Sequence, residues 1–336
     1  METITLKQAK SLIKAMAAKE SILLLSPPGV GKSDIVRQAA EEEGLECRSL
    51  LGTQIAPEDV SGIPRIINER SVFCPPRVLL PENPKPFCLF LDEFPAAAPD
   101  VQKALYALLL ERRLGEHYLP EGTWVVAAGN RQEDRALVRQ MSSALVNRTF
   151  VMQIRVDVKE WMIWAQKNKV RSEILSFIAF MPEALMRPVP SEPLPFSTPR
   201  AWASLSSALD LTEKAGILTD DVFRALCFGR VSPADATIFT ALRETKIDQF
   251  LAIDQYIQDP SLLPNEATPL WFLLNLIRNR LLSGSLTVDT EILNKFLLSL
   301  PQEQRFALFA DSLYEWGQLG AQPAMLESLK ELTGLS

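Results

Sequence analysis

The sequence predicts an α/β fold, a parallel sheet flanked by helices, which is followed by a helical lid and an additional all-helical C-terminal region. Short apolar runs alternate with amphipathic helical patterns over the first part of the chain, as they do in consecutive βαβ units. Strand patterns then stop, and helical patterns continue to the end. We therefore expect an α/β domain at 1–156, a helical lid domain at 157–230 and a helical region at 231–336.

Composition and charge limit the classes of function. The 336 residues are 47% hydrophobic and 23% charged, which is typical of a soluble globular protein. A net charge of −6 argues against a protein whose main task is binding a nucleic-acid backbone. The four cysteines are widely spaced and His117 is the single histidine, so no zinc site is expected. Without a signal-peptide pattern or a membrane-spanning run, we expect a cytoplasmic protein with no membrane partner.

The stretch from Leu23 to Ser33 has the pattern of a phosphate-binding loop. An apolar strand runs into a proline- and glycine-rich turn, and a polar helix start follows it. Lys32 would reach the β and γ phosphates, and the hydroxyl of Ser33 would contact Mg²⁺. The motif G-x-x-x-x-G-K-[ST] has a glycine where this chain has Ser26. An ordinary Pro-Gly turn is the alternative, but strand, turn, Lys-Ser and helix arrive in the required order. The predicted nucleotide-binding residues are Pro28, Gly29, Val30, Gly31, Lys32 and Ser33.

Polar residues follow two further strands of the predicted sheet. Asp92 and Glu93 end the apolar strand 87–91, and Asn130 follows the strand 124–128. Ligands of parallel sheets bind at this carboxyl edge. Asp92 suits a magnesium site together with Ser33, and Glu93 suits polarisation of an attacking water. Asn130 can hydrogen-bond that water or the phosphate, although on its own it would be taken as a turn residue.

These stretches together resemble the MoxR-type AAA+ ATPases, which belong to the helix-2-insert clade of AAA+ proteins. The resemblance runs from about Leu6 to Leu211. Its motifs are Ser26 to Ser33, Leu91-Asp92-Glu93, Ala127-Ala128-Gly129-Asn130-Arg131, Leu145-Val146-Asn147-Arg148 and Ser197-Thr198-Pro199-Arg200-Ala201-Trp202.

The resemblance implies roles that spacing alone does not give. It makes Arg148 an arginine finger donated to a neighbouring subunit and Arg200 the sensor-2 arginine of the lid, with Glu93, Asn130, Arg148 and Arg200 as the catalytic set. Arg131 and Arg135 lie close by in sequence and compete for the finger role. Whether Arg200 serves its own nucleotide or its neighbour's stays open. A hairpin at 65–73 resembles the insert of this clade, which faces the pore of a ring.

The leading hypothesis is an enzyme, a Mg²⁺-dependent ATPase that forms a ring, expected to be a hexamer, and remodels or activates a protein partner. The resemblance implies a von Willebrand factor A domain protein as that partner. A nucleic-acid motor of the helicase or restriction-translocase type is an alternative that the acidic balance disfavours. A nucleotide-gated scaffold is another, and it would be expected to lack Glu93 or Arg148, which are both present.

Overall fold

The structure, a computed structural model, describes residues 2–77, 79–81, 84–114, 116–131, 134, 141, 143–244, 253–265, 267–282, 284, 286–309 and 313–321. The chain divides into two units. Unit 1 comprises Met1–Glu160, Pro188–Pro193 and Thr198–Arg200, and unit 2 comprises Trp161–Arg187, Leu194–Ser197 and Ala201–Ser336.

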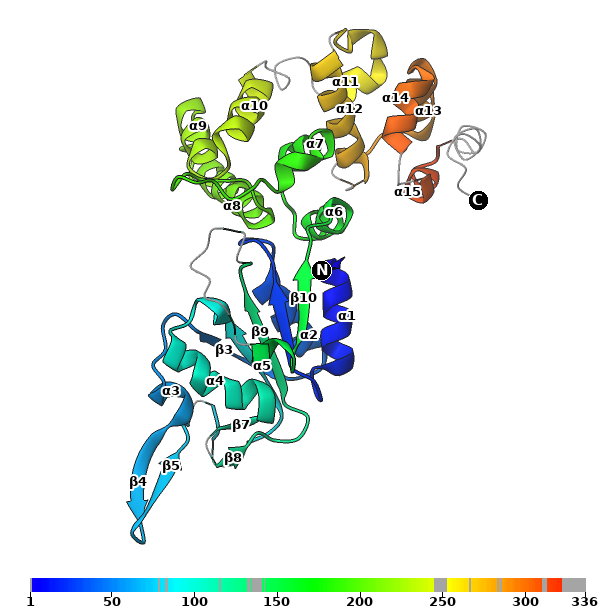
Figure 1. Cartoon of the computed structure of the whole chain (residues 1–336). Helices are drawn as coiled ribbons and strands as arrows, with labels where there is room; N and C mark the ends of the chain where they lie inside the picture. Colours follow the sequence, from blue (N-terminus) through cyan, green and yellow to red (C-terminus); the bar gives the residue numbers. More distant parts are fainter. Residues whose placement is uncertain are drawn as a thin grey trace. The chain divides into compact units, whose positions relative to one another are not determined.

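Unit 1 is built on a six-stranded sheet in which every neighbouring pair is parallel, in the order β1-β10-β2-β9-β6-β3 (Figure 1). The strands are β1 (Thr3–Ile4), β2 (Ile22–Leu25), β3 (Glu46–Leu51), β6 (Phe87–Asp92), β9 (Trp124–Gly129) and β10 (Phe150–Ile154). The three central strands β2, β9 and β6 are buried almost throughout, which explains why their sequences are continuous apolar runs.

The helices of unit 1 cover this sheet. They are α1 (Leu6–Met16), α2 (Lys32–Glu42), α3 (Glu58–Ser61), α4 (Pro99–Glu111) and α5 (Ser143–Val146), with a 3₁₀ turn at Phe94–Ala96 and a short ribbon of β7 (Arg113–Leu114) and β8 (His117–Tyr118). Val101, Leu105 and Leu108 of α4 pack in one apolar cluster with alternate residues of the central strands. This packing is the main core of the unit, and α4 covers the near face of the sheet in Figure 1.

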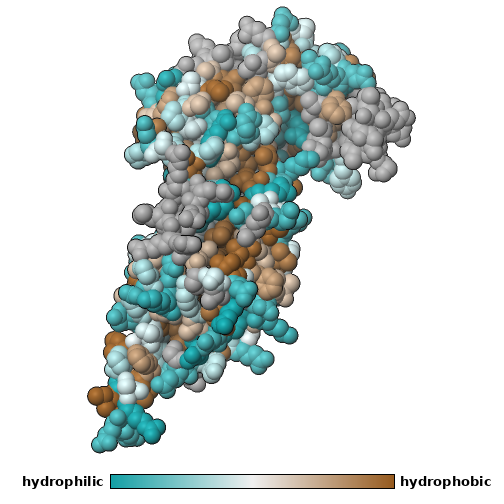
Figure 2. All heavy atoms as spheres, viewed as in Figure 1, coloured by the Kyte–Doolittle hydropathy of each residue, from teal (hydrophilic) through white to brown (hydrophobic). Residues whose placement is uncertain are grey.

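A two-stranded hairpin, β4 (Ile63–Ile67) and β5 (Arg70–Cys74), extends from unit 1 (Figure 1). Asn68 and Glu69 at its tip both have positive φ angles, 50° and 62°, as a type I′ turn requires. The hairpin exposes large apolar side chains, and Ile66 is 84% exposed. Figure 2 shows this apolar surface in brown beside the teal tip of the hairpin.

Unit 2 is helical in the part of the chain that the structure describes. The helices are α6 (Val158–Lys167, which begins in unit 1), α7 (Ser172–Phe180), α8 (Pro199–Lys214), α9 (Asp220–Phe228), α10 (Pro233–Glu244), α11 (Ile253–Gln258), α12 (Ala267–Leu282), α13 (Thr290–Ser299), α14 (Gln302–Phe309) and α15 (Leu313–Gln318), with 3₁₀ turns at Pro182–Leu185 and Pro260–Leu262. Phe177, Trp202 and Phe239 form an aromatic cluster with ring centroids 5.2 to 5.6 Å apart, which joins α7, α8 and α10.

The predicted fold class is confirmed by the parallel sheet, its flanking helices and the helical continuation. The two-residue strand β1 and the short helices α3 and α11 have patterns too short to stand out in the sequence. The predicted helical region at 231–336 contains α14 and α15, and residues 310–312 between them lie outside the described part. The domain boundaries after 156 and 230 stay predictions. Among the described residues, no helix is both long and apolar enough to cross a membrane.

Candidate nucleotide-binding site

Three predicted motifs meet at the carboxyl edge of the sheet. Parallel pairing sets Leu25 of β2 beside Gly129 of β9, and Leu91 of β6 beside Ala127 of β9. The residues that follow these strand ends therefore come together, as expected at the ligand-binding edge of an α/β sheet. The backbone N–H of Ser26 donates to the Gly129 carbonyl at 3.3 Å, which ties the start of the loop to the end of β9.

The loop between β2 and α2 has the backbone that an anion site needs. Gly29 and Gly31 adopt φ angles of 76° and 114°, which L side chains rarely adopt. Gly31 is the N-cap of α2, and Lys32 is the first helical residue. The unpaired N–H groups and the dipole of a helix N-terminus favour a negatively charged ligand.

Lys32 is 7% exposed and its ammonium is held inside the loop. It donates to the Ser26 hydroxyl at 2.9 Å, to the Ser26 carbonyl at 3.1 Å and to the Pro27 carbonyl at 3.2 Å, with a longer bond of 3.4 Å to Asn130 Oδ1. The serine that replaces the expected glycine is thus a hydrogen-bond acceptor for Lys32. In this structure, oxygens of the chain surround the ammonium, a group that also pairs with phosphate oxygens.

Burial lowers the pKa of Lys32 to about 8. The carboxylates of Asp92 and Asp134 act in the opposite direction, and the guanidinium groups of Arg200 and Arg131 lower the pKa further. The main electrostatic cost of the site is therefore the removal of the Lys32 ammonium from water. An anionic ligand would offset this electrostatic cost.

Asp92 and Glu93 lie beside the helix start in different environments. Ser33 Oγ donates to Asp92 Oδ2 at 2.7 Å, so these two oxygen ligands are already side by side. Glu93 has a φ angle of 52°, which turns the chain sharply after β6. Its carboxylate accepts from the Thr53 hydroxyl at 2.8 Å.

These groups fit a magnesium ion. Mg²⁺ prefers hard oxygen ligands and usually takes one or two carboxylates, with phosphates and water filling the remaining positions. Ser33 and Asp92 supply one hydroxyl and one carboxylate in contact. No group of three or more histidine, cysteine or acidic side chains that could hold a metal occurs among the described residues, so an all-protein metal cage is not seen there.

The two finger candidates that the structure describes differ in their surroundings. The Arg131 guanidinium is engaged by Asp134, with bonds of 2.6 and 2.9 Å. Arg148 is exposed after α5, and its side chain makes no hydrogen bond or ion pair with another described residue. Phe150 of β10 pairs with Ile22 at the start of β2, so Arg148 lies toward the edge of the sheet opposite Lys32. Arg135 lies outside the described residues.

Arg200 lies at the loop of its own chain. Its backbone N–H donates to the Gly29 carbonyl at 3.0 Å, and its charge lowers the pKa of Lys32. Thr198 packs against Gly29 so closely that a Cβ atom there would lie 2.6 Å from the threonine Oγ1. Sequence reasoning assigned no role to Thr198 or Thr53: Thr198 is only a neighbour of Arg200 in its motif, and Thr53 belongs to no nucleotide-binding motif with a fixed spacing.

Comparison with known families agrees with this geometry. Residues 21–149 match the family described as AAA domain (dynein-related subfamily). The matched range includes the phosphate loop, Asp92, Glu93, Asn130 and Arg148, and it ends before Arg200. It supports the prediction of an ATPase with a nucleotide-binding AAA domain. The narrower MoxR-type assignment is not part of that match.

Similarity to individual proteins is more distant. A stretch of 111 residues is 27% identical to the Holliday junction branch migration complex subunit RuvB of Treponema pallidum (strain Nichols), which is 33% of this chain and 25% of that protein. The chain thus spans a quarter of that relative's length. Solved structures of Thermotoga maritima RuvB superpose with a TM-score of 0.41 at 16% identity over 87% of this chain and 86% of theirs. A putative ATPase from Cytophaga hutchinsonii gives a TM-score of 0.35 at 14% identity over 84% and 76%. Such scores do not transfer an activity.

Proposed function

We propose that the protein binds ATP with Mg²⁺ at the carboxyl edge of the unit 1 sheet and hydrolyses it. The observation that carries this proposal is the buried Lys32 ammonium, which lies at a helix N-terminus with the Ser33–Asp92 oxygen pair beside it. The loop glycines and the match to an AAA domain support the same assignment.

Each group has a distinct part in hydrolysis. Lys32 exchanges its bonds to Ser26 and Pro27 for the β and γ phosphate oxygens. Ser33 and Asp92 would hold Mg²⁺, which would neutralise charge on the phosphates. Glu93 orients and polarises the attacking water, and Asn130 positions that water or the γ-phosphate.

Arg148 and Arg200 complete the site in different ways. Arg200 serves the nucleotide of its own chain, since its backbone already bonds to Gly29. Arg148 serves the nucleotide of a neighbouring copy, because its own Lys32 lies at the other edge of the sheet. A site that needs an arginine from the next copy favours a ring, for which the MoxR-type resemblance implies a hexamer.

The work driven by hydrolysis is the remodelling or activation of a protein partner. The MoxR-type resemblance supports this assignment and implies a partner with a von Willebrand factor A domain. The apolar side chains of the β4–β5 hairpin are compatible with contact to a protein, since large exposed apolar residues are common at protein interfaces.

A pair of variants tests the hydrolysis site. Lys32→Ala should abolish ATP binding, because it removes the charge that the phosphates need. Glu93→Gln should keep binding and stall hydrolysis, because only the carboxylate that polarises water is lost. Binding is measured with a fluorescent ATP analogue and turnover by phosphate release. A Glu93→Gln protein with the parent's turnover would refute the catalytic assignment.

A nucleic-acid motor is the second candidate, favoured by the similarity to RuvB, which by its name acts in Holliday junction branch migration. The net charge of −6 opposes it. Binding of branched and linear duplex DNA should be measured across a salt series in the presence of ATP. DNA binding that weakens steeply with salt, together with ATP turnover stimulated by DNA, would favour this candidate over a protein partner.

A further inference from the structure

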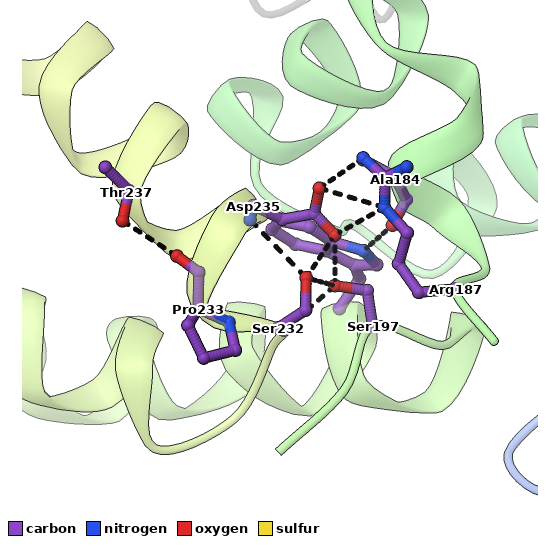
Figure 3. Close-up of polar contacts among 8 residues, drawn as sticks. Ala184, Arg187, Ser197, Ser232, Pro233, Asp235 and Thr237 are labelled. Atoms are coloured by element: carbon purple, nitrogen blue, oxygen red, sulfur yellow. Dashed lines mark hydrogen bonds and ion pairs between the residues drawn. The ribbon is translucent and has the colours of Figure 1, made fainter. Parts of the chain in front are cut away.

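A buried polar cluster in unit 2 surrounds the carboxylate of Asp235 in the first turn of α10 (Figure 3). Asp235 is 0% exposed. It accepts from the Arg187 guanidinium at 2.6 and 3.1 Å and from the hydroxyls of Ser197 and Ser232 at 2.6 Å each. Burial raises the pKa of Asp235, but these donors outweigh it and hold the pKa below its ordinary value. The carboxylate therefore stays charged.

This cluster fixes both ends of the proline-containing segment 187–197. The Arg187 N–H donates to the Ser197 carbonyl at 3.0 Å, and the Ser232 N–H donates to the Ser197 hydroxyl at 3.1 Å. Apolar side chains often stabilise a fold as well as a buried ion pair does. The hydrogen bonds of this cluster fix both the distance and the direction of the chain at Ser197, which apolar packing would not do.

The residues that follow Ser197 are those that contact the phosphate loop within unit 1. Thr198 is buried against Gly29, and the Arg200 N–H donates to the Gly29 carbonyl. Gly29 adopts a positive φ angle, one of several conformations open to glycine, so its contacts select this conformation among the alternatives. A single peptide bond joins Ser197 to Thr198.

We infer that Asp235 is a positioning residue for the phosphate loop: by holding Ser197, it restricts the residues that follow it in the chain, Thr198 and Arg200, which contact Gly29. The inference rests on the proposed nucleotide site and adds a determinant of its affinity. Asp235 is fully buried, and it acts through the segment Ser197–Arg200.

The first test is Asp235→Asn, which keeps the size of the side chain and removes its charge. We expect the KM for ATP to rise about three- to tenfold, while kcat at saturating ATP changes less than twofold. Arg171→Gln is the matched control. It breaks another ion cluster of unit 2, in which Arg171 bonds to Glu173 at 2.8 Å, Asp210 at 3.0 Å and Glu213 at 2.5 Å. This control should lower Tm and leave KM unchanged. An Asp235→Asn protein that loses Tm but keeps the parent's KM would overturn the inference.

The second test is a double-mutant cycle with Thr198→Ala. If Asp235 acts through the segment, the double variant should have the KM of the more affected single variant, because either change already frees the segment. If the two increases in KM multiply, Asp235 acts by another route and the inference fails.

Amide hydrogen exchange provides a measurement that does not need ATP. In the nucleotide-free protein, the peptide that contains Val30 and Gly31 should exchange faster in Asp235→Asn than in the parent or in Arg171→Gln. Unchanged exchange in that peptide would count against the inference even if ATP turnover were never observed. If the parent failed to bind ATP while Asp235→Asn still exchanged faster than the parent, the proposed function would be refuted and the positioning role retained.

Discussion

The phosphate loop and the β4–β5 hairpin belong to the same unit, and they differ in which side chains they bury. The loop buries a charged side chain, and the hairpin exposes apolar ones. At the loop, a charged ammonium is buried and bonded to oxygens of its own chain. At the hairpin, Ile63 and Ile66 face solvent although water solvates apolar surface poorly. The loop is thus organised by contacts within the chain, and the hairpin carries apolar surface that is not packed in the core. Substitutions at the loop are therefore expected to change activity or stability. Substitutions of the exposed hairpin side chains are expected to leave the free energy of unfolding nearly unchanged.

The largest effect is expected for Arg148→Ala. A finger that stabilises transition-state charge is worth about 10³ to 10⁵ in rate in other phosphoryl-transfer systems, so turnover should fall by that order while ATP affinity stays within about twofold. Phosphate release and equilibrium binding measure the two quantities. Arg131→Ala is the control, because Arg131 is already paired with Asp134.

A mixing experiment decides whether Arg148 acts on a neighbouring copy. Lys32→Ala subunits cannot bind ATP but keep Arg148. Arg148→Ala subunits can bind ATP but lack the arginine. Mixed assemblies should recover part of the activity that each pure variant lacks. If mixed assemblies form and stay inactive, while Arg131→Ala loses activity alone, the finger has been assigned to the wrong residue.

The parts of the site that sequence could predict are those with a fixed spacing along the chain. Lys32, Ser33, Asp92, Glu93 and Asn130 each follow a recognisable strand, and the parallel sheet places such residues at one edge. Their individual roles stay predictions until they are measured. The fold class followed from the same alternation of strands and helices.

Other contributions depend on contacts between residues far apart in sequence, which no local pattern contains. Thr53 meets Glu93, and Thr198 meets Gly29, only because the fold of unit 1 brings them together. The acceptor role of Ser26 toward Lys32 requires the loop geometry. A sequence motif alone shows this serine only as a departure from glycine.

The next effect is expected for Gly129→Ala, which tests the internal packing behind the loop. A Cβ atom at Gly129 would lie 2.2 Å from Pro95 Cδ, so the chain must shift to admit it. We expect a loss of about 1–3 kcal/mol in the free energy of unfolding, as for other overpacked cores. Gly44→Ala is the control: a Cβ there meets nothing within 4 Å, and only the strain of its φ angle of 69° remains. A Gly129→Ala protein as stable as the parent would contradict the described packing, because Gly129 does not have a positive φ angle and the substitution adds no such strain.

A smaller effect is expected from pH, through the lowered pKa of Lys32. With a pKa of about 8 in the ligand-free protein, Lys32 is mostly protonated at pH 7 and mostly neutral at pH 9. Bound phosphates favour the charged form, so ATP binding should take up a proton, and affinity should fall about tenfold between pH 7 and pH 9. Calorimetry in buffers of different ionisation enthalpy measures the proton uptake.

The same shift fixes the sign of its contribution to folding. Between pH 8 and the ordinary lysine value of 10.5, the unfolded chain binds more protons at this residue than the folded protein does. The contribution of Lys32 to the free energy of unfolding therefore rises with pH through that window. Lys32→Arg, whose side chain stays charged, should abolish the dependence of affinity on pH between 7 and 9 if it still binds ATP. A parent whose affinity is flat over that range would show that Lys32 does not titrate there.

The smallest effect is expected for Ile66→Ala on the hairpin, and it separates the two regions most directly. Ile66 is 84% exposed and Ile22 in β2 is 0% exposed, so the same Ile→Ala substitution compares an exposed position with a buried one. Ile22→Ala removes buried methyl groups and should cost about 2–5 kcal/mol in the free energy of unfolding. Ile66→Ala should change it by less than about 0.5 kcal/mol, because the removed atoms already face water. Chemical denaturation of the two variants measures both values under one set of conditions. If Ile66→Ala cost more than about 1 kcal/mol, the hairpin would be packed against the chain in solution, and its apolar side chains would belong to the core.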